Sequence, residues 1–463
     1  ALGAVVLGAR LREFHAGAAG SPDLVLMHTD DVPPNFLEAL GKVWTLKQTE
    51  YIDGVPALYT SKGTVFDGVF TKLAAWGLAE YDKVLLLDID IIPLRSPLAL
   101  FDLDPPAALI RGNQDIAHGI EIDGRRFFGG EAYGPEDSWG QCGGINAGVI
   151  LLRPCRATLA RMVAEVTSER HPEHLAGHGP EQDYLTRFFA AAPWRNINVR
   201  WNYQIHHVPF ALEQVVNWRA SVLQRGGELS EADRAWRPPR LRLRPEEIGI
   251  VHFSGDVKLW HLVLDAAHQS SQRRAVEHVA STWAEVDSAG FAEHLISTSC
   301  ASYGLWVGRS APATDYAQFS CELGPSGRLE LLGAEGWRED LTPFVDEAVV
   351  QLRAVARMAT EAWRNSAQRL LAEALPGLLE SLRRPVAPEG SHPPGARVEV
   401  LYRRPAGGEI REDWIPAKVV SVHADGRHVV RYDRGGSWGD TERGVASERL
   451  RSPGRAPEEP GED

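Results

Sequence analysis

The stretch from Val84 to Ile92 constrains this chain most strongly, because it sets two acids one residue apart inside an apolar run. A continuous run of Val, Leu and Ile about as long as a strand predicts a β-strand that is covered on both faces. In extended backbone the residues at i and i+2 share a face, so the carboxylates of Asp88 and Asp90 can point the same way. The alternative is an acidic loop edge with two solvated side chains.

Two like charges at a buried strand end are costly unless something positive lies between them. A hard divalent cation prefers oxygen ligands, and a bound diphosphate could complete its shell. The pair Asp88 and Asp90 therefore predicts a metal site.

Strand and helix patterns alternate around this run. The spacing of apolar residues predicts helices over 1–14, 33–40 and 65–80, and strands over 23–28, 149–152, 197–200 and 248–253. Such alternation predicts an α/β domain with a mostly parallel sheet covered on both sides. Ligands of such sheets bind at the carboxyl ends of the strands, which is where the two acids fall. A Gly-rich stretch over 112–144 predicts a long loop over a pocket.

Three further segments carry polar groups that could serve the same site. Asn146 lies among small residues that allow close approach to the backbone, and its alternative role is that of a turn residue before a strand. Glu181, Gln182 and Asp183 open a helix after a proline, where the helix dipole alone would also explain the acids.

The third segment runs from His252 to Trp260 and follows a predicted strand. An imidazole can bind a metal, Gly255 leaves its amide accessible, and Lys258 offers a point charge to phosphate. An isolated histidine after a strand is usually only a satisfied structural residue. Four such residues within one short segment, His252, Gly255, Lys258 and Trp260, favour a binding site.

Length and charge narrow the class of protein. A chain of 463 residues predicts two or three domains, and a net charge of -13 argues against non-specific nucleic-acid binding. The four cysteines lack a close metal spacing and do not require an oxidising compartment. No stretch predicts a membrane span or a secretory leader. The chain begins at Ala1 without an initiator Met, so we expect a fragment or a processed form.

The second half predicts different units. Residues 266–384 carry long amphipathic patterns, clearest between Pro343 and Leu378, which predict a helical region. Residues 385–396 are predicted to form a Pro-rich linker, and residues 453–463 a disordered tail. Between them, residues 397–452 predict the short strands of a small β-barrel with a hairpin turn at Asp425-Gly426. The barrel segment resembles Tudor or Agenet barrels. In that family aromatic residues can cage a methylated Lys or Arg, and the candidates here, which core packing would also explain, are Tyr402, Trp414, Tyr432 and Trp438.

Taken together, the motifs of residues 1–265 resemble the glycogenin-like retaining glycosyltransferases (glycosyltransferase family 8). The segments that carry the resemblance are Leu87 to Asp90, Asn146 to Val149, Glu181 to Asp183 and His252 to Trp260. Supporting similarities are the apolar start at residues 1–8 and Thr71 to Leu73. The family's first strand is expected before residue 1, and its usual Asp-Gln pair is Glu181-Gln182 here.

The resemblance implies a nucleotide-diphosphosugar transferase fold of the GT-A kind, with a mixed sheet flanked by helices, that uses a UDP-sugar and Mn²⁺. It implies that Asp88, Asp90 and His252 ligate the metal and that Gly255 and Lys258 hold the diphosphate. Lys72 would be a further donor contact, Asn146 and Gln182 would touch the transferred sugar, and Glu181 or Asp183 would line the acceptor side. Self-glucosylation is not implied, because no segment matches glycogenin's own acceptor tyrosine.

Two functions are therefore expected. The first is a metal-dependent retaining hexosyltransferase with a saccharide or protein-linked acceptor. The alternative is a non-catalytic transferase fold whose C-terminal barrel docks to a modified protein. The donor sugar stays open between glucose, galactose, glucuronate and xylose. The compartment is either the cytoplasm or, if an anchor precedes residue 1, the Golgi lumen.

Overall fold

The structure is a computed structural model. It describes residues 2–15, 20–52, 55, 68–110, 117–123, 144–168, 180–189, 191–205, 215, 219, 222, 228–254, 258, 319–323, 329–333, 338–340, 342–383, 392, 395–406, 409–422, 428–432, 441–445 and 450–452. Among these residues no helix has the length and apolarity needed to cross a bilayer.

The first helix, the first strand and the second helix form where the sequence predicts them, and a strand that was not predicted, β2, follows. Helix α1 (Leu2–His15) is followed by strand β1 (Val25–His28), helix α2 (Pro34–Gly41) and strand β2 (Thr45–Gln48). A proline at the start of α2 suits the first turn of a helix, where its missing N–H costs nothing. Strands β1 and β2 pair in parallel, and Trp44 Nε1 donates to Ala4 O at 2.8 Å, which ties α1 to this unit.

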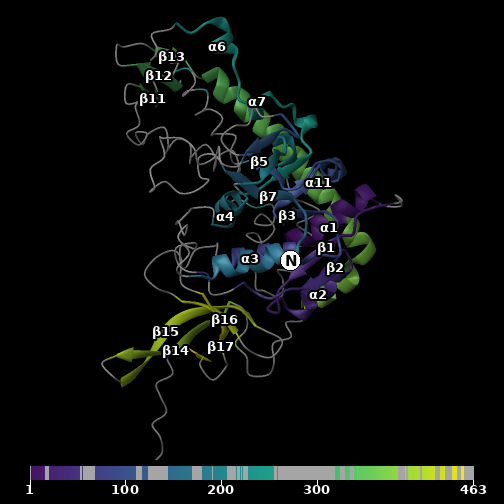
Figure 1. Ribbon diagram of the computed structural model, residues 1–463, viewed down its shortest axis with the longest axis vertical. Coiled ribbons are helices and arrows are strands. Elements are labelled where there is room, and N and C mark those ends of the chain that lie inside the picture. The colour runs from purple at the N-terminus through teal and green to yellow at the C-terminus, as the bar shows by residue number, and fades with distance from the viewer. Residues whose placement is uncertain are drawn as a thin grey trace, which may run out of the picture.

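The main sheet has five strands in the order β3-β7-β5-β8-β6. Figure 1 shows three neighbours of this sheet, β3, β7 and β5, side by side. Its strands are β3 (Val84–Leu87), β5 (Ala107–Ile110), β6 (Glu121–Asp123), β7 (Ile145–Leu152) and β8 (Pro193–Asn196). Within this sheet only the β5–β8 pair is parallel, so the expectation of a mostly parallel sheet is wrong and the sheet is mixed. The reason is that these pairs join segments far apart along the chain, so the local alternation of helix and strand patterns does not set the direction of pairing.

The run from Val84 to Ile92 is two strands instead of the single strand that its hydrophobicity predicts. Strand β3 pairs with β7, whereas β4 (Ile91–Pro93) belongs to a separate sheet in the order β4-β10-β9. Asp88 and Asp90 lie in the turn between the two strands. Strand β3 is half-buried, whereas its partner β7 is buried along its whole length.

The second sheet is short and brings distant segments together. Its central strand β10 (Ile250–His252) pairs antiparallel with β4 and parallel with β9 (Tyr203–Gln204). The strand predicted over 197–200 is absent, since Val199–Trp201 forms a 3-10 turn, η4, and the strand lies earlier as β8. This sheet places His252 beside the turn that carries the two acids.

Two hydrophobic cores lie on opposite faces of β7. Val149 and Leu151 pack into one core with α1 and Trp44, whereas Ile150 and Leu152 pack into the other. The second core is closed by the 3-10 helix η1 (Val69–Gly77), α3 (Arg156–Val166) and α4 (Pro180–Phe188). The main sheet is thus covered on both sides, as the sequence predicts.

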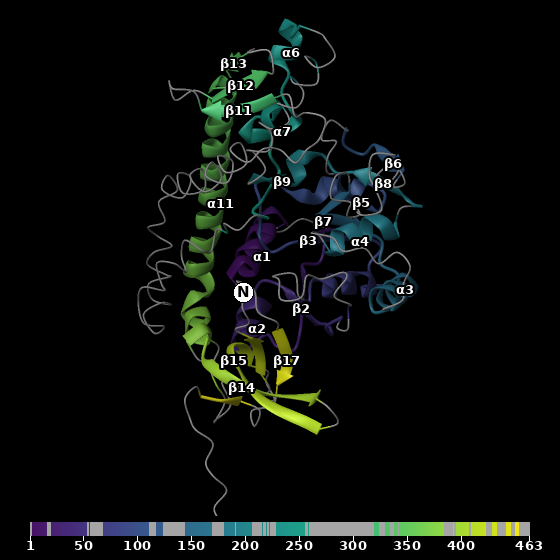
Figure 2. The ribbon, with the colours of Figure 1, turned by 90° about the vertical axis from the view of Figure 1, so that its left-hand side faces the viewer.

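The part of the chain that follows β10 contains both a long helix and a further β-sheet. Helix α11 (Thr342–Arg383) confirms the amphipathic pattern seen there, but the strands β11 (Phe319–Leu323), β12 (Leu329–Gly333) and β13 (Arg338–Asp340) form an antiparallel sheet inside the region predicted as helical. The short helices α6 (Glu231–Ala235) and α7 (Pro239–Arg242) and the turn η6 (Pro245–Glu247) precede β10. Figure 2 shows α11 running from the β11–β13 sheet past α1 to the C-terminal strands.

The C-terminal strands form one antiparallel sheet in the order β17-β16-β15-β14-β18. They are β14 (Arg397–Ala406), β15 (Glu409–Val422), β16 (His428–Tyr432), β17 (Thr441–Val445) and β18 (Leu450–Arg451), with a small apolar core that includes Val398, Val419 and Val430. Three strands lie where the sequence predicts them. Closure into a Tudor-like barrel and the domain limits stay predictions, and the Asp425-Gly426 turn lies outside the described residues.

Of the four aromatic cage candidates, only the Trp414 side chain lies within the described part of the chain. The Arg451 guanidinium carbon lies 4.1 Å from the Trp414 ring centroid, and Arg451 Nε pairs with Glu399 Oε2 at 2.6 Å. The chain's own arginine therefore makes a cation–π contact of the kind proposed for a ligand.

The contact between α1 and Trp44 gives a test of the packing. At Gly8 an added Cβ would lie 2.5 Å from Trp44 Nε1, whereas at Gly41 it would meet Leu46 at an ordinary 3.5 Å. We expect Gly8→Ala to lower the free energy of unfolding by about 1 to 3 kcal/mol, because overpacking outweighs the gain in helix propensity. Gly41→Ala, the control in α2, should be neutral or stabilising by up to about 1 kcal/mol. Urea unfolding followed by tryptophan fluorescence measures both, and equal stability of the two variants would contradict the packing.

Candidate metal centre

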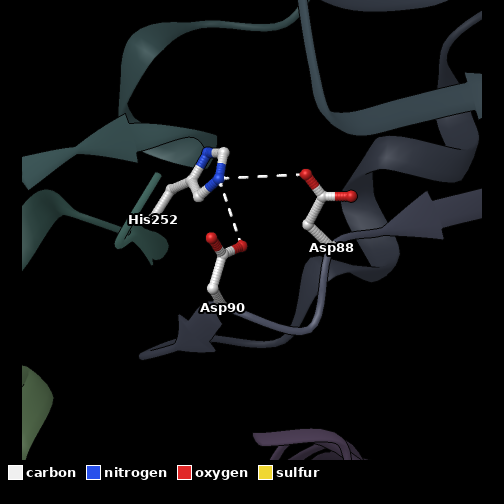
Figure 3. A group of neighbouring side chains, drawn as sticks. All are labelled: Asp88, Asp90 and His252. Atoms are coloured by element: carbon white, nitrogen blue, oxygen red, sulfur yellow. Dashed lines mark ion pairs between the residues drawn. The ribbon is translucent and has the colours of Figure 1, made fainter. Parts of the chain in front are cut away.

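Asp88, Asp90 and His252 come together where the two sheets meet (Figure 3). His252 Nε2 lies 3.3 Å from Asp90 Oδ1 and 4.0 Å from Asp88 Oδ2, and one ligand atom from each residue falls within 4.8 Å of the others. Asp88 N donates to Gly148 O at 2.9 Å and Asp90 O accepts from Phe253 N at 2.9 Å, so the two acids are anchored to different sheets. Backbone hydrogen bonds therefore fix both carboxylates relative to the imidazole.

A chain of hydrogen bonds determines which imidazole nitrogen faces the acids. Asn146 Oδ1 accepts from Gly148 N at 3.1 Å and from Asn202 Nδ2 at 2.7 Å. The amide oxygen of Asn202 is then left to accept from His252 Nδ1, at 2.8 Å. When the ring is neutral, its proton lies on Nδ1, and Nε2 turns a lone pair towards the two carboxylates.

The imidazole lies directly against the backbone of Gly148. A Cβ at this position would fall 2.2 Å from His252 Cε1. The pairing of β5 with β7 shifts register here, between Ala108 and Leu109, and β7 exposes different faces before and after Gly148. Such irregularities re-aim side chains next to functional sites. The glycine thus provides the room in which the ring sits.

Two buried atoms at this point lack a hydrogen-bond partner, namely Asp90 Oδ1 and His252 Nε2. Buried polar atoms are nearly always paired, and two facing lone pairs repel. A divalent cation between them would satisfy both, since carboxylate oxygens and imidazole nitrogen are ordinary ligands of Mn²⁺ and related ions. The donor set therefore fits a metal ion.

Two lysines balance the charge of the acids. Lys72 Nζ lies 2.8 Å from Asp88 Oδ1 and 3.0 Å from Glu181 Oε1, and Lys258 Nζ pairs with Asp90 Oδ2. Burial lowers the pKa of Lys72, but Asp88 and Glu181 outweigh it and leave that pKa well above its usual value. Burial likewise raises the pKa of Asp90, yet Lys258 and, when its ring is protonated, His252 hold it below its usual value. The lysine ammonium and the Asp90 carboxylate are therefore charged at neutral pH.

The remaining candidates lie at the start of α4 and inside β7. Asn146 is a buried residue of the strand, so the alternative of a turn residue is wrong. Gln182 Oε1 accepts from Asn146 Nδ2 at 3.5 Å and from Ala147 N at 3.4 Å, which joins α4 to β7. Glu181 and Asp183 are both buried. Gly255 lies outside the described residues.

Sequence reasoning missed Asn202 and the role of Gly148. Asn202 stands between two aromatic residues in a segment that the sequence reads only as the end of a strand. An available signal was its polar side chain in an apolar setting, because a buried amide needs partners. The sequence shows Gly148 only as one of several small residues. Its close contact with the His252 ring, more than 100 positions away, leaves no local pattern in the sequence.

Residues 57–263, less than half of the chain, match the family model described as Glycosyl transferase family 8. An uncharacterized protein of Acanthamoeba polyphaga mimivirus is 29% identical over 203 residues, which are 44% of this chain and 66% of that protein. Human glycogenin-1 is 22% identical over 283 residues, which are 59% of this chain and 63% of glycogenin-1. The chain thus spans slightly less than two thirds of each relative.

Among solved structures, the galactosyltransferase LgtC in complex with donor and acceptor sugar analogs aligns at 18% identity with a TM-score of 0.34. The alignment covers 60% of this chain and 91% of LgtC. The family match and the glycogenin relative support a glycosyltransferase family 8 domain in the first part of the chain.

The hydrogen bond to Asn202 gives a direct test of the centre. We expect Asn202→Ala to weaken Mn²⁺ binding by roughly 10- to 100-fold, as is typical for groups that orient a ligating histidine. Titration of the free Mn²⁺ signal by electron paramagnetic resonance measures it. Asn198→Ala, which removes an amide that caps the preceding turn through Arg200 N, serves as the matched control. Equal affinity in both variants would contradict the orienting role.

The space beneath the imidazole gives a second test. Gly148→Ala should displace His252 because the new Cβ would overlap the ring. We expect Mn²⁺ affinity to fall at least about tenfold. Isothermal titration with Mn²⁺ checks this, with circular dichroism to verify that the fold persists. Unchanged affinity in a folded variant would show that the ring does not bind the ion from this position.

Proposed function

We propose that this chain is a metal-dependent retaining glycosyltransferase that moves a hexosyl or related unit from a UDP-sugar to a saccharide or protein-linked acceptor. The proposal also assigns residues 1–265 to a nucleotide-diphosphosugar transferase domain. Support comes from the match of residues 57–263 to Glycosyl transferase family 8 and from the geometry of the Asp–His cluster. One observation carries the metal dependence, namely the two facing unpartnered atoms Asp90 Oδ1 and His252 Nε2.

In this proposal Asp88, Asp90 and His252 hold a divalent cation, expected to be Mn²⁺. When bound, the ion would supply positive charge for the diphosphate leaving group. The protein's own part is to orient the imidazole. It does so through the hydrogen bond from His252 Nδ1 to Asn202 Oδ1, which turns Nε2 towards the two carboxylates.

The lysines would deal with the charge of the diphosphate. Lys258 lies at the Asp90 side of the cluster, where its ammonium can reach an anion that approaches the centre. Together with the amide of Gly255 it would hold the diphosphate and favour the more strongly charged leaving state. Lys72 lies on the other side, between Asp88 and Glu181, and would contact the donor there.

The sugar itself would lie against β7 and the start of α4. Asn146 and Gln182 would touch the transferred sugar, and Glu181 or Asp183 would line the acceptor side. Glu181 is held by Lys72, which fixes its longer side chain in one direction. For retention we propose attack from the same face. The bond from the anomeric carbon to the diphosphate breaks, the acceptor oxygen bonds to that carbon, and the acceptor proton passes to the departing phosphate oxygen.

The test of the function is UDP release from a panel of UDP-sugars with and without Mn²⁺. We expect release by the unaltered chain to require the ion and to disappear with a chelator. The double variant Asp88→Asn, Asp90→Asn should lose at least about 100-fold in rate, because it removes two anionic ligands of the ion. Asp82→Asn, on the same segment but ahead of β3, is the control.

Release at the parent rate by the double variant would remove the metal argument. Absence of both UDP binding and UDP release would instead favour a non-catalytic binding protein.

A further inference from the structure

Helix α11 lies outside the residues that match the family, yet it packs against β4, the strand that begins directly after Asp90. It also contacts α1, α2, α7 and η6, and Figure 2 shows it running from the β11–β13 sheet past α1 to the C-terminal strands. Two sets of contacts lead from this helix to the two outer strands of the β4-β10-β9 sheet.

The first set leads from α11 to β4. Ser366, which is buried, donates from Oγ to Glu13 Oε1 at 3.0 Å. Glu13 in turn pairs through Oε2 with Arg10 Nη1, and Arg10 Nε donates to Pro93 O at 2.9 Å. Pro93 ends the strand that begins directly after Asp90 and lies opposite Ile250 of β10.

The second set leads from α11 to β9. Glu347 Oε2 accepts from Arg237 Nε at 2.7 Å, just before α7, and Gln351 Nε2 donates to Leu243 O at 2.6 Å, just after α7. Helix α7 is thereby held on both sides. It carries the buried Arg240, whose guanidinium carbon lies 5.7 Å from the ring centroid of Tyr203 in β9.

These contacts matter because β10 has no other neighbours in its sheet than β4 and β9, within the described residues. His252 is the last residue of β10, and its Nε2 must meet Asp90 Oδ1, on the β4 side, across 3.3 Å. Metal ligands tolerate only about 0.2 Å of misplacement. A small slip of either outer strand would therefore spoil the centre.

We propose that α11 positions the metal centre from outside the family-like domain, with Glu13, Ser366 and Gln351 as positioning residues that fix β4 and β9 around His252. The identity of the centre rests on the proposed function. The positioning role itself is argued only from contacts between residues of this chain.

The experiment uses the full chain with Glu13→Ala, Ser366→Ala and Gln351→Ala, each titrated with Mn²⁺ alone by electron paramagnetic resonance. We expect affinity to fall about three- to tenfold, less than the roughly 10- to 100-fold seen for groups that touch a metal ligand directly. Glu13→Gln keeps an acceptor oxygen for Arg10 and an amide group that can donate to Ser366 Oγ, so it should largely restore binding. Val350→Ala, at an exposed position of the same helix, is the matched control.

Hydrogen exchange in the absence of metal gives an independent measurement. Peptides that cover β4 and β10 should exchange faster in the Glu13→Ala and Gln351→Ala variants than in Val350→Ala. If the variants lower the melting temperature but leave both Mn²⁺ affinity and exchange of β10 unchanged, the role of α11 is merely structural and the inference fails. If the unaltered chain binds no Mn²⁺, the metal centre of the proposed function fails with it. Normal binding in every variant overturns the positioning alone.

Discussion

The hydrogen bond from His252 Nδ1 to Asn202 Oδ1 is the interaction on which the candidate site depends. It fixes the tautomer of the ring, and it is itself fixed because Asn202 must donate to an Asn146 oxygen that also accepts from Gly148 N. A backbone amide of β7 thus determines, through three side chains, that a lone pair faces Asp88 and Asp90. Without this order the ring could turn a proton towards the acids, and the cluster would be an ion pair instead of a ligand set.

The negative charges of the two acids are balanced by two lysines. Each acid has its own lysine, with Lys72 beside Asp88 and Lys258 beside Asp90. Each acid therefore has a cationic partner and still offers a second oxygen. The lysines pair with Asp88 Oδ1 and Asp90 Oδ2, whereas the oxygens nearest the imidazole are Asp88 Oδ2 and Asp90 Oδ1. The same ammonium groups are suited to meet an incoming diphosphate.

The sequence predicted the chemistry of the site better than its construction. Asp88, Asp90 and His252 could be found because each follows an apolar, strand-like segment, a local signal that needs no partner. The division of residues 84–92 into β3 and β4 could not be predicted from the sequence. Both halves are equally hydrophobic, and only their pairing with β7 and β10 separates them. Pairing direction failed for the same reason, because alternating patterns predict elements and leave register open. Asn202 was missed because its partners are 50 or more positions away.

The turn that carries the two acids is also the seam between two sheets. Asp88 continues the ladder of β3 with β7, and Asp90 continues the ladder of β4 with β10. An ion bound by both acids would therefore link one sheet to the other, and its binding free energy would oppose their separation. Heat resistance and protease resistance at this seam would then follow the concentration of free cation. A chelator would loosen the joint between the sheets before it disturbed the core of either one.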